Sequence, residues 1–147
     1  MFSRLPIHVS SAATGTLEDF AVTRGIVVAT PGALPQVEGG YGHLVIAGAS
    51  VSLAEGLGAE VNRVRRWLNA AALVAPRSDG GGVTVVGDVG DRVRQALIGW
   101  DGWGLAQADL NERTEAALPP YRRAMRLTGD ASAIAQAVAQ LPKERAD

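Results

Sequence analysis

The 147-residue sequence predicts an α/β fold with a mainly parallel sheet flanked by helices. First, short apolar runs alternate with stretches of helical periodicity, which is the pattern of a parallel α/β sheet. Second, hydrophobic residues make up 47% and charged residues 20% of the chain, as is typical of a soluble globular protein. Third, the length corresponds to about one domain, given ~100–200 residues per domain.

Four apolar runs are predicted to be strands, at residues 5–9, 25–30, 43–47 and 83–86. The second run is β-branched on both faces, as expected of a strand that is covered on both sides. Three consecutive glycines, at 80–82, introduce the fourth run. The spacing of the runs leaves room for a crossover helix between some of the strands only.

The clearest helix is predicted over residues 53–75, where apolar side chains form one stripe at helical spacing. Pro76 is expected to end it. A shorter helix is predicted around 93–98, ending near Gly99, and a third over 103–117, ending before the prolines at 119 and 120. The stripe of the first helix consists of Leu57, Val61, Val64, Leu68, Ala71 and Ala75.

After these prolines, residues 121–128 alternate like a strand, and a helix is predicted from Ala131. Ile134, Val138 and Leu141 would form the apolar face of that helix. Because one strand and one helix cannot bury their apolar faces alone, we expect them to open a further, truncated α+β domain. The sequence thus predicts a first domain over 1–118 and the start of a second over 119–147, within a fragment of a longer protein.

The composition excludes several classes of function. Fourteen basic and fifteen acidic residues leave a net charge of −1, too little to draw the whole chain onto DNA or an anionic membrane. The absence of cysteine excludes disulfides, thiol nucleophiles and thiolate metal sites, and agrees with a cytoplasmic location. The single lysine is Lys143, so no Gly-rich phosphate-binding loop with its lysine is present. No apolar run approaches the ~20 residues of a membrane span, so no membrane partner is expected.

Five segments together carry a resemblance to a known family. They are residues 25–35 (GIVVATPGALP), 38–48 (EGGYGHLVIAG), 60–68 (EVNRVRRWL), 94–101 (RQALIGWD) and 118–121 (LPPY). In order and spacing they resemble the second helicase lobe of the PriA family of replication-restart helicases (primosomal protein N-prime), from about Phe2 to Thr128. The resemblance implies a RecA-like helicase lobe followed by the start of the C-terminal domain of that family.

The chain departs from this family at both ATPase motifs of the lobe. Where active members carry G-T-Q-M-x-x-K-G, this chain has residues 29–35 (ATPGALP). Where they carry Q-V-x-G-R-A-G-R, the first arginine position is Val74, and Arg77 is the candidate for the second, catalytic arginine. An arginine finger contributes ~10³–10⁵ in rate, so replacement by valine removes that contribution. The resemblance therefore implies a branch of the family with eroded ATPase motifs.

For function, the resemblance implies a DNA-binding and scaffolding role at stalled replication forks, with branched or single-stranded DNA and other replication and primosome proteins as partners. It implies a cytoplasmic, nucleoid-associated protein, with the family's zinc-binding cysteines upstream of this segment and no cofactor within it. We expect no ATPase or helicase activity from this chain alone. One alternative is the lobe of an active ATP-dependent DNA helicase that needs the missing first lobe. Another is a free-standing α/β enzyme or binding module.

The first basic stretch that is a candidate for DNA contact lies on the long helix. Arg63, Arg65 and Arg66 would hold phosphates by charge, and Trp67 would stack on a base. The alternative is an ordinary solvated helix face, with Trp67 packed in the interior.

The second basic stretch follows the paired prolines. Arg122 and Arg126 would share one face of the predicted strand, while Tyr121 and Arg123 would share the other with Met125. DNA contact is again one interpretation, and an exposed edge strand with no ligand is the other.

Two loops are weaker candidates. Thr30, Pro31 and Gly32 follow a predicted strand, where ligands bind in open α/β sheets, and would be the remnant of a nucleotide- or DNA-facing loop. The plain alternative is a strand-to-loop turn. The glycines of residues 38–42 would form a flexible ligand loop or, as we favour, serve tight turns.

The titratable residues do not suggest catalysis or metal binding. His8 and His43 are the two histidines, and without cysteines or a carboxylate pair beside them they make no convincing metal site. Glu112 and Glu115 are interpreted as a solvated helix face and not as a general acid–base pair. We therefore expect structural roles for the two histidines and a solvent-facing role for the two glutamates.

Overall fold

The computed structural model describes residues 5–17, 24–50 and 56–140. The chain divides into two compact units, Met1–Asp109 and Leu110–Asp147, and each is described by itself. The α/β class is confirmed, since the first unit is built from parallel strand pairs and α-helices. A RecA-like lobe and a domain boundary at 118/119 stay predictions.

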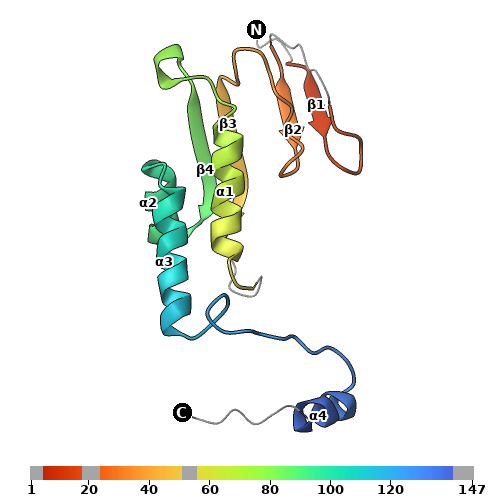
Figure 1. Cartoon of the computed structure of the whole chain (residues 1–147). Coiled ribbons are helices and arrows are strands. Elements are labelled where there is room, and N and C mark those ends of the chain that lie inside the picture. The colour runs from red at the N-terminus through yellow and green to blue at the C-terminus, as the bar shows by residue number, and fades with distance from the viewer. Residues whose placement is uncertain (1–4, 18–23, 51–55, 141–147) are drawn as a thin grey trace. The chain divides into compact units, whose positions relative to one another are not determined.

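The strands pair in parallel, as predicted, but form two small sheets and not one (Figure 1). β1 (Ile7–Ser10) pairs with β2 (Ile26–Ala29), and β3 (His43–Ser50) pairs with β4 (Gly82–Asp88). Between β2 and β3 the chain makes two turns, and the backbone of Tyr41 then bridges to Val74. This bridge joins the residues before β3 to the segment after the long helix, and β3 pairs with β4 and not with β2.

The long helix, α1 (Ala59–Ala71), is shorter than the predicted 53–75 at both ends. At its start, Gly56 and Gly58 have φ of 95° and 76°, which is not a helical conformation, and residues 51–55 lie outside the described residues. At its end, the Tyr41 N–H donates to the Leu73 carbonyl and the Ala75 N–H donates to the Tyr41 carbonyl, both at 2.9 Å. This strand-like pairing draws the backbone out of the helix before Pro76 is reached.

The next two α-helices along the chain agree closely with the prediction. A short 3₁₀ turn, η2 (Arg77–Asp79), leads into β4, and α2 (Gly90–Ile98) and α3 (Gly102–Glu115) follow. Asp101 begins α3, because its Oδ1 accepts a 2.7 Å hydrogen bond from the N–H of Gly104, as an N-cap residue does. None of the helices in the described ranges is long and apolar enough to cross a membrane.

One hydrophobic core lies where α1, α2 and α3 meet β3. The predicted stripe of α1 is confirmed in part, since Val64 is fully buried and Val61 and Leu68 are partly buried against the core. The buried core residues are Ala49, Val64, Trp67, Val93, Ala96 and Leu105. The first unit thus has an interior of its own.

In the second unit, α4 (Ala131–Ala139) forms where the sequence predicts it, although Leu141 lies outside the described residues. The predicted strand over 121–128 is wrong: these residues have no regular structure and are exposed. A strand needs a hydrogen-bonded neighbour for its backbone, and within the described part of the chain none lies beside this segment.

Candidate nucleic-acid interface

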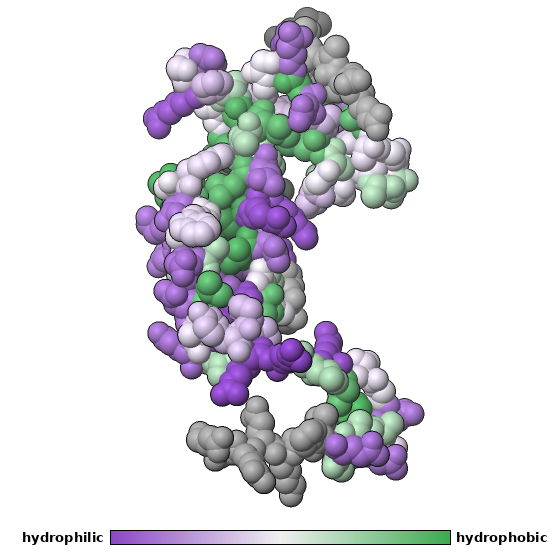
Figure 2. Space-filling view, viewed as in Figure 1, coloured by the Kyte–Doolittle hydropathy of each residue, from purple (hydrophilic) through white to green (hydrophobic). Residues whose placement is uncertain are grey.

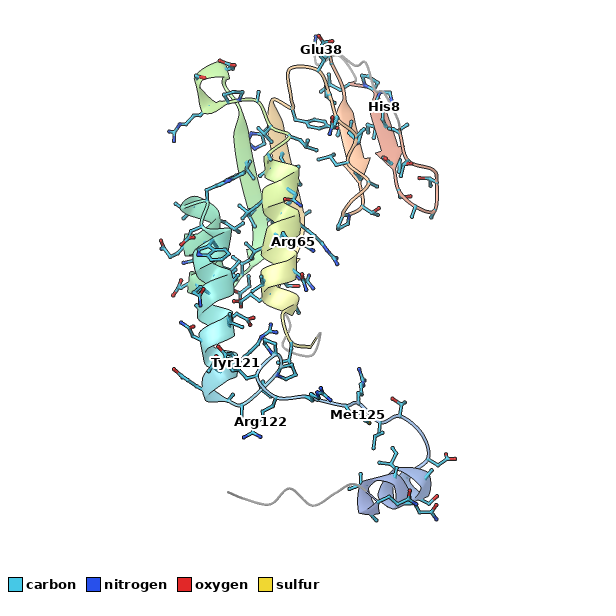
Figure 3. All side chains as sticks on the ribbon, in the orientation of Figure 1. His8, Glu38, Arg65, Tyr121, Arg122 and Met125 are labelled. Carbon is cyan, nitrogen blue, oxygen red and sulfur yellow. The ribbon has the colours of Figure 1, made fainter. Side chains whose placement is uncertain are left out.

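The arginines of the first basic stretch lie on α1, but Trp67 does not accompany them to the surface. Arg65 is exposed (Figure 3), as is Arg66, and Arg63 is half-buried. Trp67 is only 9% exposed and packs in the core with Val64, three residues earlier on the same face of the helix. The expectation that Trp67 stacks on a base is therefore wrong for this structure, because the helix turns its indole inward.

Arg65 instead borders an apolar hollow with two other tryptophans. The hollow has a volume of about 500 Å³ and lies between α1 and the start of α3. Trp100 is 56% and Trp103 is 80% exposed there. The lining residues are Val61, Arg65, Leu68, Asn69, Ala72, Trp100, Gly102, Trp103 and Ala106.

Sequence reasoning did not find this hollow. A signal was present, because two of the three tryptophans of the chain stand three residues apart at 100 and 103. Such a pair at the start of a helix is also a common core pattern. Only the packing of α3 shows that both indoles stay at the surface.

The second basic stretch lies in the second unit, on the chain between α3 and α4. Tyr121 and Arg122 are exposed (Figure 3), and so are Arg123 and Arg126. The N–H of Tyr121 donates to the Leu118 carbonyl at 3.0 Å, so the stretch begins in a turn. Since the segment is not a strand, its side chains are not sorted onto the two faces that the alternation predicted.

The loop at Thr30, Pro31 and Gly32 is a tight turn directly after β2. The Ala33 N–H donates to the Thr30 carbonyl at 2.9 Å, and Gly32 has a φ of 88°. Proline at the second position and a glycine with positive φ at the third are what a type II turn requires. The buried Ser10 hydroxyl holds the turn in place, because it donates to the Ala33 carbonyl at 2.6 Å.

The glycines of residues 38–42 serve turns and close backbone approach, as favoured from the sequence. Gly39 and Gly40 both have a φ of 77°, and the Gly40 N–H closes a turn onto the Val37 carbonyl at 2.9 Å. The Tyr41 hydroxyl donates to the Pro35 carbonyl at 2.8 Å, and burial raises the pKa of Tyr41 above its usual 10.0. This network fixes the loop against the segment that follows α1.

The catalytic-arginine candidate, Arg77, lies in η2 and is exposed. It does not line the hollow beside α1. Its place between α1 and β4 matches the order of elements on which the candidate assignment rested, and the assignment stays a prediction.

The remaining titratable candidates are dispersed. The His43 Nε2 and the Thr84 hydroxyl form a 2.9 Å hydrogen bond across the β3–β4 pair. His8 is half-buried on β1. Glu112 and Glu115 are exposed on α3. Within the ranges that the structure describes, no three potential metal ligands come together.

The sequence matches no family model, and no solved structure matches it. It is 39% identical over 127 residues to a protein of Mycobacterium tuberculosis (strain ATCC 25618 / H37Rv) named "Probable replication restart protein PriA", covering 86% of this chain and 19% of that protein. The protein of the same name from Mycobacterium leprae (strain TN) is 35% identical over 146 residues, covering 97% of this chain and 22% of that protein. The chain thus spans about a fifth of the length of these curated relatives.

Proposed function

Since the chain is homologous to one region of the replication restart proteins of the PriA family, we propose that it is a DNA-binding and scaffolding part of such a protein. It acts at stalled replication forks and contacts branched or single-stranded DNA. Other replication and primosome proteins dock on the complete protein. The observation that carries the proposal is the extent of the match, 35% identity over 97% of the chain.

The exposed arginines support a contact with phosphate. Arg65 and Arg66 project from α1, and no partner for either is found in the part of the chain that the structure describes. Arg123 and Arg126 are likewise exposed. Because the net charge of the whole chain is −1, binding must depend on such local groups and not on an overall field.

We also propose that this part of the protein binds DNA without hydrolysing ATP. Val74 stands at the first arginine position of the family's motif, and its backbone bridges to Tyr41. A valine side chain cannot stabilise a transferring phosphoryl group. Arg77 is the one arginine near this motif that would serve an alternative, ATP-dependent helicase lobe.

The test is a fluorescence-anisotropy titration of the 147-residue chain with forked, single-stranded and duplex DNA at several salt concentrations. Salt-dependent binding that prefers forked or single-stranded DNA supports the proposal. The double variant Arg65→Gln/Arg66→Gln should bind more weakly with a smaller salt dependence, since each phosphate contact on a single strand contributes a slope of ~0.7. Arg94→Gln is the matched control, because Arg94 is exposed but paired with Asp91 at 2.6 Å.

Two results would contradict the proposal. Absence of binding to all three DNAs at low salt would exclude DNA contact by this chain. In the complete protein, DNA-stimulated release of phosphate from ATP that is lost in the Arg77→Ala variant would favour the alternative, a working helicase lobe.

A further inference from the structure

We infer that the hollow between α1 and α3 is a stacking site for the bases of single-stranded DNA. The inference rests on the proposed function and deepens it. It assigns base contact to Trp100 and Trp103, which sequence reasoning did not single out, in place of the buried Trp67.

The first argument is the exposure of the aromatic rings. Trp103 is 80% and Trp100 is 56% exposed, on the wall of one hollow. An indole that is buried in the core stabilises the folded state by several kcal/mol, and these two exposed rings do not make that contribution. Sequence-tolerant single-strand binders present aromatic rings in this way, because every base has a π face to stack on them.

The second argument is charge complementarity. Among the residues that the structure describes, Arg65 is the only charged one that lines the hollow, and no carboxylate does. Arg65 is exposed and has no ion-pair partner in the described part of the chain. The Asn69 amide beside it can donate and accept hydrogen bonds. A cation and an amide next to two flat apolar rings match a phosphate next to a base.

The third argument concerns the shape of the apolar surface. A second hollow of about 190 Å³ adjoins the first, and the two share Leu68 and Trp100. It is bounded by β3, β4, α1 and α2, and Ile98, at 75% exposed, stands on its rim. Figure 2 shows apolar surface, in green, left uncovered beside α1. Such a track has room for successive bases. In duplex DNA the bases are stacked on each other and do not reach it, so the occupant is a single strand.

Binding of an oligothymidylate of about ten nucleotides tests the inference, with an abasic oligonucleotide of the same length as the probe for phosphate contact alone. Stacking should quench tryptophan emission with the thymidylate and not with the abasic strand. Trp103→Ala should weaken thymidylate binding by about 5-fold or more, the low end of one lost stacking contact. Trp103→Phe should restore most of the affinity. Because Trp103 is 80% exposed, neither change is expected to disturb folding, and the far-ultraviolet circular dichroism of each variant checks this.

The outcomes separate this inference from the proposed function. If forked DNA binds through the arginines but Trp103→Ala binds thymidylate like the unaltered chain, the stacking site is refuted and the proposed function stands. Equal affinity for the thymidylate and abasic strands refutes it as well. If no DNA of any kind binds, both fail. If Trp103→Ala abolishes self-association in sedimentation instead, the hollow is an interface between copies of the chain, and the inference is overturned.

Discussion

Alanine substitutions at two neighbouring glycines test how closely the loop before β3 packs against the segment after α1. Gly39 and Gly40 share a φ of 77°, so alanine at either position meets the same unfavourable backbone conformation. That cost is about 1–2 kcal/mol per residue. The two positions differ in their surroundings. A Cβ on Gly39 would meet nothing within 4 Å, whereas a Cβ on Gly40 would lie 2.8 Å from the Ala75 nitrogen and 3.0 Å from the Leu73 carbonyl oxygen.

The neighbours of Gly40 cannot easily give way. They are backbone atoms, and both take part in the 2.9 Å hydrogen bonds that join Leu73 and Ala75 to Tyr41. Inserting a methyl group against such a structure costs about 1–3 kcal/mol more. We therefore expect Gly40→Ala to lower the free energy of unfolding by about 2–5 kcal/mol. Gly39→Ala, its matched control, should lower it by only about 1–2 kcal/mol.

The assay is urea unfolding of the two variants and the unaltered chain, followed by far-ultraviolet circular dichroism. The slope with urea should be similar in all three, so that the midpoints report stability. Equal midpoints for Gly39→Ala and Gly40→Ala would refute the reasoning, because they would show that the segment after α1 does not pack on Gly40. A larger loss for Gly39→Ala would refute it too.

Three further predictions follow from individual contacts. Ser10→Ala removes the hydroxyl that donates to Ala33, and should cost about 1–3 kcal/mol and speed amide exchange in the turn after β2, as hydrogen-exchange mass spectrometry would show. Burial raises the pKa of Tyr41, so the phenol proton is lost from the unfolded state at a lower pH than from the folded state. The free energy of unfolding should therefore fall as pH rises above 10.0. A Tyr41→Phe variant that kept the same loss of stability between pH 9 and 11 would exclude this cause. The Leu105 side chain is 4% exposed, so Leu105→Ala should lower the free energy of unfolding in urea by about 2–5 kcal/mol. The Leu118 side chain is 37% exposed, so Leu118→Ala should lower it much less. Similar losses of stability in the two variants would mean that Leu105 is not in the core.

The elements were predictable wherever the signal was local. The apolar spacing of Val61, Val64 and Leu68 indicated α1, and short apolar runs indicated all four strands, since period and residue type act within a few residues. The ends of α1 were not predictable to the same degree. They depend on Tyr41, about thirty residues away from the pairing segment, and on the positive φ of Gly58.

The sequence predicted the exposed arginines of the candidate site but not its exposed tryptophans. Arg65 and Arg66 were expected on an exposed helix face because charged side chains seldom lie in a core, and the structure places them there. Tryptophan is intermediate in burial, so residue type alone does not predict whether its side chain lies in the core or at the surface. Trp67 was assigned to the surface as one alternative and lies in the core, while Trp100 and Trp103 lie at the surface.

By itself, the sequence determined the α/β class, the parallel direction of the strands, the approximate position of each α-helix and the resemblance to the PriA family. These features follow from local periodicity and from the order of short segments, and both can be read from the sequence without knowledge of the fold. The tertiary structure alone decided that the strands form two sheets, that residues 121–128 are not a strand and that Arg65 shares a hollow with Trp100 and Trp103. Those features depend on which distant backbone groups bond and which side chains find a partner to pack against, and no short stretch of sequence contains that information.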